Sequence, residues 1–538
     1  MKITEKVPKS WLIDNLKEVP IVLRDDGFSQ FFVVDGMDKH LLEKRCIDYL
    51  SKTKVKVKEW GLGPGSVFTF DTKVGEVFGT KLDEKQLNML REGDRWVHSN
   101  VTGMISAGDD PLKVVVKKGH EIGLKVWARL EMNHEYAPAD ENNWMWVGLV
   151  GEFNKKHPEY RIPNSVNLDF KYEEVREFKI SILREAALKG IDGISMDFAV
   201  YPPFLSDPDR DFHIITDFIA RVREMTTEVS KITNRKIYII VRVPINYDSI
   251  GLHWRDWISK KLIDIIIPTV VRLKDEFDVS IDEFIEAAKD TECKVYGCVR
   301  PYLGYINSDP IPEDDKTHVT RYDRDMTVEM FHAKAFLLLR AGVNGLQIAT
   351  GSGDYGSKSD DWKKKTDAWK SVYNDLGSPE MLMYKDKDYV INRKGQFPMV
   401  LTTGENIKYA KVRIADDIQK LLTENCRMHM NIVLFCRVLS TDEILSLYIN
   451  DNGPLHLTQD AFDKIDNDAP IEIISGKKNP SDHVFYDKNW WKKGMHEFIV
   501  PIEWFVLGEN DIKILYNCNN SDKNEFRITD MDLKIYFD

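Results

Sequence analysis

Short apolar runs alternate with longer helical stretches through the first two-thirds of this chain. The runs are rich in β-branched residues and almost free of polar ones, as strands are when both faces of their sheet are covered. A repeated strand–helix–strand alternation predicts parallel pairing. Eight runs have this character: 30–34, part of 55–70, 124–130, 193–198, 237–243, 263–268, 294–299 and 345–349.

The stretches between the runs have the spacing of amphipathic helices. Residues 172–189 carry one apolar stripe, and Gly190 follows it as a stop signal. Thr327 is placed to cap a helix that ends at Gly342. Eight strands with intervening helices predict an α/β fold, a (β/α)8 TIM barrel, over residues 1–380. A doubly wound open sheet is the alternative, but no GxGxxG fingerprint follows an early run.

The pattern changes after about residue 385. Short alternating runs are separated by loops rich in Asn, Asp and Gly, which is typical of an antiparallel β-sandwich. Gly508-Glu509-Asn510 resembles the turn that precedes the last hairpin of jelly-roll accessory domains in carbohydrate enzymes. The sequence therefore predicts a jelly-roll-like sandwich over residues 385–538, with strands at 408–414, 428–438, 471–474, 497–500, 511–516 and 532–537.

Charge and cysteine content exclude several classes of partner. The net charge of −12 disfavours a broad nucleic-acid surface, because phosphate binding needs clustered Lys and Arg. The 6 Cys show no zinc spacing, and Cys293 and Cys298 fall on opposite faces of one run, as buried thiols rather than a disulfide. We expect no metal and no cofactor. The oligomeric state stays open.

Membrane and targeting signals are also missing from the sequence. No run of 18 apolar residues predicts a membrane helix. The N-terminus is charged and lacks the apolar core of a signal peptide. Two expectations remain open: a cytoplasmic protein, or a periplasmic or secreted one from which a signal has been removed.

Function in a TIM barrel lies where the strands end and the following loops begin. Carboxylates at these ends suit acid/base or nucleophilic hydrolysis. Arginines there either clamp a carboxylate or sulfate of the substrate, or pair with the protein's own carboxylates in a buried network. The strand ends and following loops supply Asp35, Asp71, Arg129, Glu131, Asn133, His134, Asp197, Tyr201, Arg242, Arg272, Arg300, Tyr302 and Asp354.

The segment 190–204 contains Asp197 followed by Tyr201-Pro202-Pro203. It resembles the fourth-strand signature of the bacterial glycosyl-hydrolase-like family ten proteins. The segments 254–270 and 342–349 resemble that family's sixth and eighth strands. One departure is that Met196 and Asp197 stand where the family often has two adjacent acids. The resemblance implies a glycoside hydrolase of the type found in polysaccharide-degrading bacteria, acting on a polysaccharide or oligosaccharide.

This implied chemistry needs two carboxylates, whose separation decides between retention and inversion. We expect Asp197 to be the nucleophile or transition-state stabiliser, because it ends a central strand. Glu131 is the first candidate for the general acid, with Glu135 and Asp354 as alternatives. A period of two places Glu131 on the same face as Arg129 and Asn133.

We expect the remaining candidates to bind substrate. The arginines favour an anionic glycan that bears uronate or sulfate, and the aromatic residues are placed to stack on sugar rings. The long loop after the third strand is either such a platform or a lid that packs its aromatics inward. The predicted substrate-binding residues are Arg129, Asn133, His134, Trp144, Trp146, Tyr201, Arg242, Arg300, Tyr302 and Asp354.

Two other functions compete with hydrolysis. A non-catalytic carbohydrate-binding protein on a degenerate barrel would leave Asp197 without a second carboxylate in catalytic reach. A lyase or aldolase would need a strand-end lysine or a metal triad, and the sequence offers neither at a strand end.

Overall fold

The computed structural model gives the fold described below. It describes residues 16–136, 144–245, 250–270, 277–300, 302–303, 324–349, 369–391, 396–397, 399–402, 405–462, 495–519 and 525–538.

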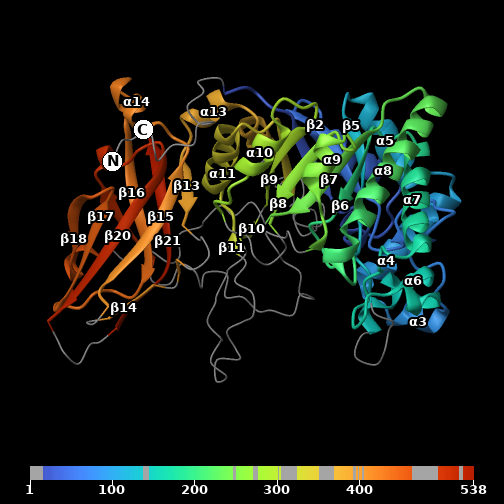
Figure 1. Ribbon diagram of the computed structural model, residues 1–538, viewed down its shortest axis with the longest axis horizontal. Coiled ribbons are helices and arrows are strands. Elements are labelled where there is room, and N and C mark those ends of the chain that lie inside the picture. Colours follow the sequence, from blue (N-terminus) through green and yellow to red (C-terminus); the bar gives the residue numbers. More distant parts are fainter. Residues whose placement is uncertain are drawn as a thin grey trace.

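Within these residues, eight strands pair in parallel and close into a barrel (Figure 1). Their order around the barrel is β1-β12-β9-β8-β7-β6-β5-β2, so neighbours in space are mostly neighbours in sequence. The predicted (β/α)8 barrel is confirmed. The strands are β1 (Ile21–Asp25), β2 (Val55–Gly61), β5 (Lys125–Glu131), β6 (Gly193–Asp197), β7 (Tyr238–Pro244), β8 (Ile265–Thr269), β9 (Lys294–Val299) and β12 (Gly345–Ala349).

The first strand lies elsewhere than predicted. Residues 30–34 belong largely to a helix, α1 (Ser29–Phe32), and β1 precedes it. The Asp26 carboxylate accepts hydrogen bonds from the backbone N–H groups of Phe28 and Ser29, which turns the chain as soon as β1 ends. Asp35 therefore does not end the first strand, and its assignment to the barrel mouth was wrong.

The second strand is also shorter than predicted, because it ends at Gly61. The following segment forms two short strands, β3 (Val67–Phe68) and β4 (Glu76–Val77), which pair with each other. Asp71 lies in the loop between them and forms an ion pair with Lys73 at 2.8 Å, so it does not end a barrel strand.

Helices cover the outside of the barrel (Figure 1). The predicted caps are present: the Thr327 side chain accepts from the N–H of Met330, and Gly342 ends the helix with φ +94°. The barrel helices are α1, α2 (Lys39–Cys46), α3 (Glu84–Met89), α4 (Glu92–Ser106), α5 (Pro111–Glu121), α6 (Glu152–Lys156), α7 (Glu173–Leu188), α8 (Pro208–Thr233), α9 (Trp254–Ser259), α10 (Asp282–Ala288) and α11 (Val328–Ala341).

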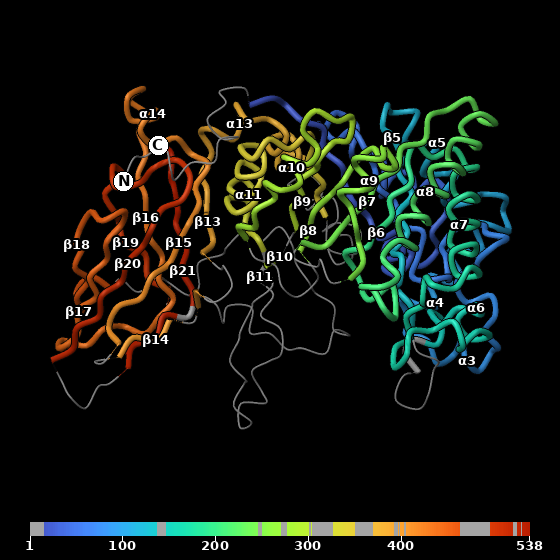
Figure 2. The backbone as a smooth tube through the Cα atoms, in the orientation of Figure 1, coloured from blue at the N-terminus to red at the C-terminus, as the bar shows by residue number. Residues whose placement is uncertain are grey.

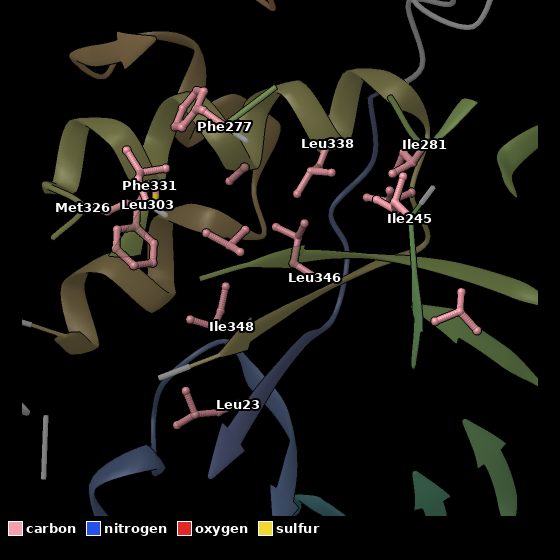
Figure 3. Close-up of a cluster of buried hydrophobic side chains, with 14 of the residues drawn as sticks. Leu23, Ile245, Phe277, Ile281, Leu303, Met326, Phe331, Leu338, Leu346 and Ile348 are labelled. Carbon is pink, nitrogen blue, oxygen red and sulfur yellow. The ribbon is translucent and has the colours of Figure 1, made fainter. Parts of the chain in front are cut away.

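Alternate strand residues point to the helices and to the barrel axis. Leu23, Leu346 and Ile348 point outward and meet Phe331 and Leu338 of α11 (Figure 3). A separate apolar cluster fills the lower interior with residues from strands around the barrel: Val22, Val57, Trp127, Ile240, Ile265, Ile267, Tyr296, Cys298 and Ala349. The interior is therefore a packed core below the strand ends, not a pore.

The C-terminal region contains antiparallel sheets, as predicted (Figure 2). One has the order β13-β21-β16-β19, with β14 also paired to β21, and the other has the order β15-β20-β17-β18. The strands are β13 (Lys387–Val390), β14 (Met399–Thr402), β15 (Ile407–Ile414), β16 (Met428–Cys436), β17 (Glu443–Ile449), β18 (Asn452–Leu457), β19 (Met495–Val500), β20 (Gly508–Cys518) and β21 (Glu525–Phe537).

The sequence missed β13, β14, β17 and β18, and the predicted strand at 471–474 lies outside the described residues. Two short helices, α13 (Pro379–Met383) and α14 (Ile418–Thr423), flank these sheets, and two further short strands, β10 (Tyr302–Leu303) and β11 (Arg324–Asp325), pair near the barrel. Cys293 and Cys298 are buried free thiols, as predicted. In the described part of the chain, no helix has the length and apolarity needed to span a bilayer.

Candidate active site

Polar side chains replace the apolar core where three neighbouring barrel strands end. In the parallel register, Glu131 of β5 lies beside Asp197 of β6, and Asp197 lies beside Arg242 of β7. Because alternate residues face the barrel axis, Arg129, two residues before Glu131, faces the same mouth. Arg24, near the end of β1, reaches this group from across the barrel. We call Arg24, Arg129, Glu131, Asp197 and Arg242 the mouth cluster.

Asp197 is the most deeply placed carboxylate of the mouth cluster, and its side chain is 0% exposed. Arg242 donates to its Oδ2, Arg24 Nη2 lies 3.4 Å from the same oxygen, and Arg129 Nη1 lies 3.7 Å away. Burial lowers the pKa of the Arg242 guanidinium, but the charge of Asp197 outweighs it, so this pKa lies above its ordinary value. Asp197 is therefore the buried carboxylate around which the three arginines gather.

Glu131 lies nearer the surface, with a side chain that is 14% exposed. Arg129 and His134 both donate to it, and Arg24 Nη2 lies 3.3 Å from its Oε1. Burial alone would raise the pKa of Glu131, but the Arg129 and His134 charges oppose it and hold the pKa well below the ordinary value. Glu131 is thus an ionised carboxylate.

One nitrogen of Arg24 joins the two carboxylates. The separation between the facing oxygens of Glu131 and Asp197 cannot exceed the sum of their 3.3 and 3.4 Å distances to this nitrogen. Burial, together with the charges of Arg129 and Arg242, lowers the pKa of Arg24 to about 10. The sequence analysis missed Arg24 because it placed the first strand too late. The buried Ile-Val-Leu run before it was the available signal.

His134 and Tyr201 meet above Glu131. The His134 Nδ1 atom bonds to Glu131, and its ring stacks on Tyr201 with centroids 4.1 Å apart and planes 19° from parallel. Tyr136 also packs against the imidazole, with ring centroids 4.9 Å apart and planes tilted by 35°. Tyr201 has φ +56°, an uncommon backbone conformation for a residue other than glycine. Two predicted binding residues are therefore brought together at the mouth.

Asn133 and Glu135 hold the loop instead of lining the mouth. The Asn133 amide donates to the carbonyls of Leu168 (3.0 Å) and Pro203 (2.7 Å) and is fully buried. Glu135 forms a buried ion pair with Lys179 at 3.0 Å. The sequence predicted that Arg129, Glu131 and Asn133 share one face of the strand. Arg129 and Glu131 do, and they bond to each other. Asn133 does not, because β5 ends at Glu131.

A further polar layer lies below the mouth cluster. Gln347 of β12 donates to Glu59 of β2 at 2.7 Å, and both are fully buried. Within the described residues, Ser195 Oγ, Arg129 Nε and Arg242 Nε are buried and have no hydrogen-bond partner. Buried polar atoms of this kind are usually paired, often with ordered water. Gln347 was predicted at the end of the eighth strand, whereas Glu59, at an inward position of β2, was not among the predicted residues.

Arg300 lines a separate pocket of about 40 Å³ beside the barrel mouth. It donates to the Val270 carbonyl at 3.4 Å, and Cys298 and Thr269 share the pocket wall. The backbones of Trp144 and Trp146 form part of a 3₁₀ helix, Trp144–Leu149, and Tyr302 lies in β10. The side chains of Trp144, Trp146 and Tyr302, and all of Asp354 and Arg272, lie outside the described residues.

No group of three or more His, Cys, Asp or Glu within the described ranges is arranged to hold a metal ion. The mouth brings together two carboxylates, three guanidinium groups and one imidazole. Such a set suits stabilisation of charge and proton transfer without a metal ligand set.

The chain matches no protein-family model, and a search of curated proteins finds no relative. Solved structures similar to it include a cycloisomaltooligosaccharide glucanotransferase from Paenibacillus sp. (TM-score 0.33, 10% identity, 97% of this chain, 58% of that one). Another is a chitinase from Paenibacillus sp. str. FPU-7 (TM-score 0.41, 10% identity, 96% of this chain, 54% of that one). A third is a β-L-arabinopyranosidase from Geobacillus stearothermophilus (TM-score 0.35, 11% identity, 94% of this chain, 97% of that one).

This chain spans little more than half the length of the first two of these proteins. With TM-scores below 0.5 and identities near 10%, the three likenesses assign no activity, and the barrel is established by its strand pairing.

Proposed function

We propose that this protein is a glycoside hydrolase whose reaction takes place at the mouth cluster. The observation that carries the proposal is that Glu131 and Asp197 both contact one nitrogen of Arg24. Asp197 therefore has a second carboxylate within catalytic reach, which the binding-protein alternative would lack. The likeness of segment 190–204 to the family ten signature supports the same chemistry.

The bridging by Arg24 also bears on stereochemistry. Carboxyl groups about 5–5.5 Å apart support retention, and gaps of about 6.5–9.5 Å support inversion, because inversion needs room for a water molecule. Two oxygens that share one nitrogen, at 3.3 and 3.4 Å, cannot lie farther apart than the sum of those distances, and this bound is compatible with the shorter range. We therefore propose hydrolysis with retention of the anomeric configuration.

The surroundings of the two carboxylates favour distinct roles. The predicted nucleophilic role of Asp197 and acid role of Glu131 are untested. Since Asp197 is sealed beneath the arginines and Glu131 is ionised and partly exposed, we propose that Glu131 faces the anomeric centre and opposes its developing positive charge. Asp197 then acts as a positioning residue that holds Arg24, Arg129 and Arg242. The region after residue 385 is proposed as an accessory domain.

A preference for anionic glycans is a finer proposal. Arg129 and Arg242 pair with the protein's own carboxylates, Glu131 and Asp197, so they are not free to clamp an anionic group of the substrate. An anionic group of the substrate would meet Arg24, whose side chain is 17% exposed, and Arg300 at the adjoining pocket. A uronide hydrolysed faster than the matching neutral glycoside supports this preference, and equal rates contradict it.

The test is hydrolysis of a panel of neutral, uronate-bearing and sulfated aryl glycosides and oligosaccharides. We expect the wild type to cleave at least one of them, and Glu131→Gln and Asp197→Asn to lose about 10²–10³-fold in kcat, as removal of a transition-state charge partner does. Glu228→Gln, an exposed glutamate on α8 that pairs with Arg184, is the matched control. Wild-type rates in Glu131→Gln, or no cleavage of any substrate, would contradict the proposal.

The burial of Asp197 favours a second candidate, a carbohydrate-binding protein on a degenerate barrel. That candidate predicts saturable glycan binding by calorimetry with no product released by the wild type. Turnover by the wild type rules it out.

A further inference from the structure

The mouth holds one side chain that is arranged for proton transfer and is neither of the paired acids. His134 follows the end of β5 and bonds through Nδ1 to the Glu131 carboxylate. Its ring stacks on Tyr201 with centroids 4.1 Å apart and packs at a tilt against Tyr136 with centroids 4.9 Å apart. The side chain is 16% exposed. One nitrogen is thus fixed by a carboxylate, and the aromatic contacts fix the plane of the ring.

The other ring nitrogen of His134 has no hydrogen-bond partner among the described residues, although it is buried. Leaving a buried ring nitrogen without a hydrogen-bond partner costs stability. An oxygen supplied by a substrate would remove that cost. A carboxylate on one imidazole nitrogen, with the other nitrogen turned toward a reacting oxygen, is the arrangement that orients histidines for acid and base catalysis.

The carboxylates themselves are poorly suited to give a proton. Arg129, His134 and Arg24 keep Glu131 ionised, and Asp197 lies below them with 0% exposure and three guanidinium neighbours. Cleavage of an unactivated glycoside needs a proton on the leaving oxygen. The site therefore needs a proton carrier other than its two acids.

We propose that His134 is the catalytic acid and base of this site, and that Glu131 orients its imidazolium. This inference rests on the proposed glycoside hydrolase function. Imidazole exchanges a proton near neutral pH, so the same ring can give a proton and take one back within a single turnover.

The two steps balance around one proton. In the first, the bond between the anomeric carbon and the glycosidic oxygen breaks, its electron pair stays on that oxygen, and the oxygen takes the proton from His134 Nε2. The ionised Glu131 opposes the positive charge left on the sugar. In the second, a water oxygen bonds to the anomeric carbon and gives its proton to Nε2. The net reaction is addition of one water, with the imidazolium restored.

Three side chains contact the imidazole. Glu131 bonds to it from the end of β5, Tyr201 stacks on its ring, and Tyr136 packs against the ring at a tilt. Arg129 and Arg24 act on it only through the Glu131 carboxylate that they also bind. We expect the alkaline limb of the kcat profile to belong to this dyad, and to disappear when His134 is replaced.

The test compares leaving groups. His134→Ala and His134→Gln are assayed on glycosides of dinitrophenol, which leaves without a proton, and on alkyl or phenyl glycosides, which need one. We expect kcat/KM, which reports cleavage of the glycosidic bond, to fall about 10²–10⁴-fold for the poor leaving groups, to change little for dinitrophenol, and to recover partly with added imidazole. His213→Ala, an exposed histidine on α8, is the matched control.

An equal loss on both classes of substrate in both His134 variants, or no loss, overturns the role of His134. Since the wild type is assayed in the same series, the two proposals fail separately. Turnover by the wild type with an unaffected His134→Gln rejects only the histidine. No turnover of any glycoside rejects hydrolysis and the inference together.

Discussion

The chain contains two buried ion clusters that are built on different principles. The first is the mouth cluster. The second, which we call the junction cluster, joins Lys387 and Tyr389 of β13 to Asp416. Lys387 Nζ lies 2.9 Å from Asp416, the Tyr389 hydroxyl donates to Asp416 at 2.6 Å, and both charged side chains are 0% exposed. It lies where the C-terminal sheets meet α11, whose Phe336 ring sits 5.0 Å from the lysine nitrogen.

The two clusters differ in how much of their charged side chains is exposed to solvent. The junction cluster pairs one cation with one anion and shuts out water. The mouth cluster gathers three arginines around two acids and exposes Glu131 and Arg24 to 14% and 17%. Charged groups that remain partly exposed at a barrel mouth can meet a substrate, whereas fully buried ion pairs hold elements together. The comparison predicts stability effects at one cluster and activity effects at the other.

The largest expected effect on stability is at the junction cluster. Asp416→Ala leaves the charge of Lys387 buried without its anion, and we expect the free energy of unfolding to fall by about 3–5 kcal/mol. Urea unfolding measures it. Glu509→Ala, which breaks the exposed pair with Lys411 at 2.6 Å, is the control and should cost less than about 1 kcal/mol. If both variants lose less than about 1 kcal/mol of unfolding free energy, the junction cluster does not hold the elements together as proposed.

An intermediate effect is expected at Asn133, close to the mouth cluster but bound only to backbone. Asn133→Ala removes its bonds to Leu168 and Pro203, and we expect a loss of about 1–3 kcal/mol in urea unfolding. Asn517→Ala, at an exposed position of β20, should change stability by less than about 0.5 kcal/mol. If Asn133→Ala is as stable as the wild type, the residue is not a loop tether and a direct role in substrate binding becomes the better account.

The smallest effect is a pH dependence at Glu131. The folded-state pKa of Glu131 lies well below the ordinary 4.5, so the unfolded chain binds the extra proton first as pH falls. Its contribution to stability is therefore present above about pH 4.5 and is lost as pH falls through the lower folded-state value. We expect urea midpoints of wild type and Glu131→Gln to converge on acidification below pH 4.5. Parallel curves would show that Glu131 is not held ionised.

Most of the barrel could be predicted because its strands are short, continuous apolar runs, whereas most of its helices carry apolar residues along one stripe only. The exception is instructive. Phe31, Phe32, Val33 and Val34 form a stronger apolar run than Ile21–Asp25, yet the turn made by Asp26 puts them in and after a helix. Because the first strand was predicted at the wrong place, Arg24 was not among the predicted site residues.

The candidate site was predicted in part. Asp197, Glu131, Arg129 and Arg242 lie together because strand periodicity and parallel register fix inward positions. Ion pairing depends on distances across the barrel, which sequence spacing does not contain, so the engagement of Arg129 and Arg242 by the protein's own acids was not decided. Asn133 has the period of a mouth residue, but the strand ends before it.

We propose above all that the mouth cluster hydrolyses a glycoside with retention of the anomeric configuration. The most direct measurement is a time-resolved proton NMR spectrum of the first product released by the wild type from the substrate that it cleaves fastest. The account predicts that the first anomer to appear has the configuration of the substrate, before mutarotation produces the other. Appearance of the opposite anomer first, or no product from any glycoside, would contradict it.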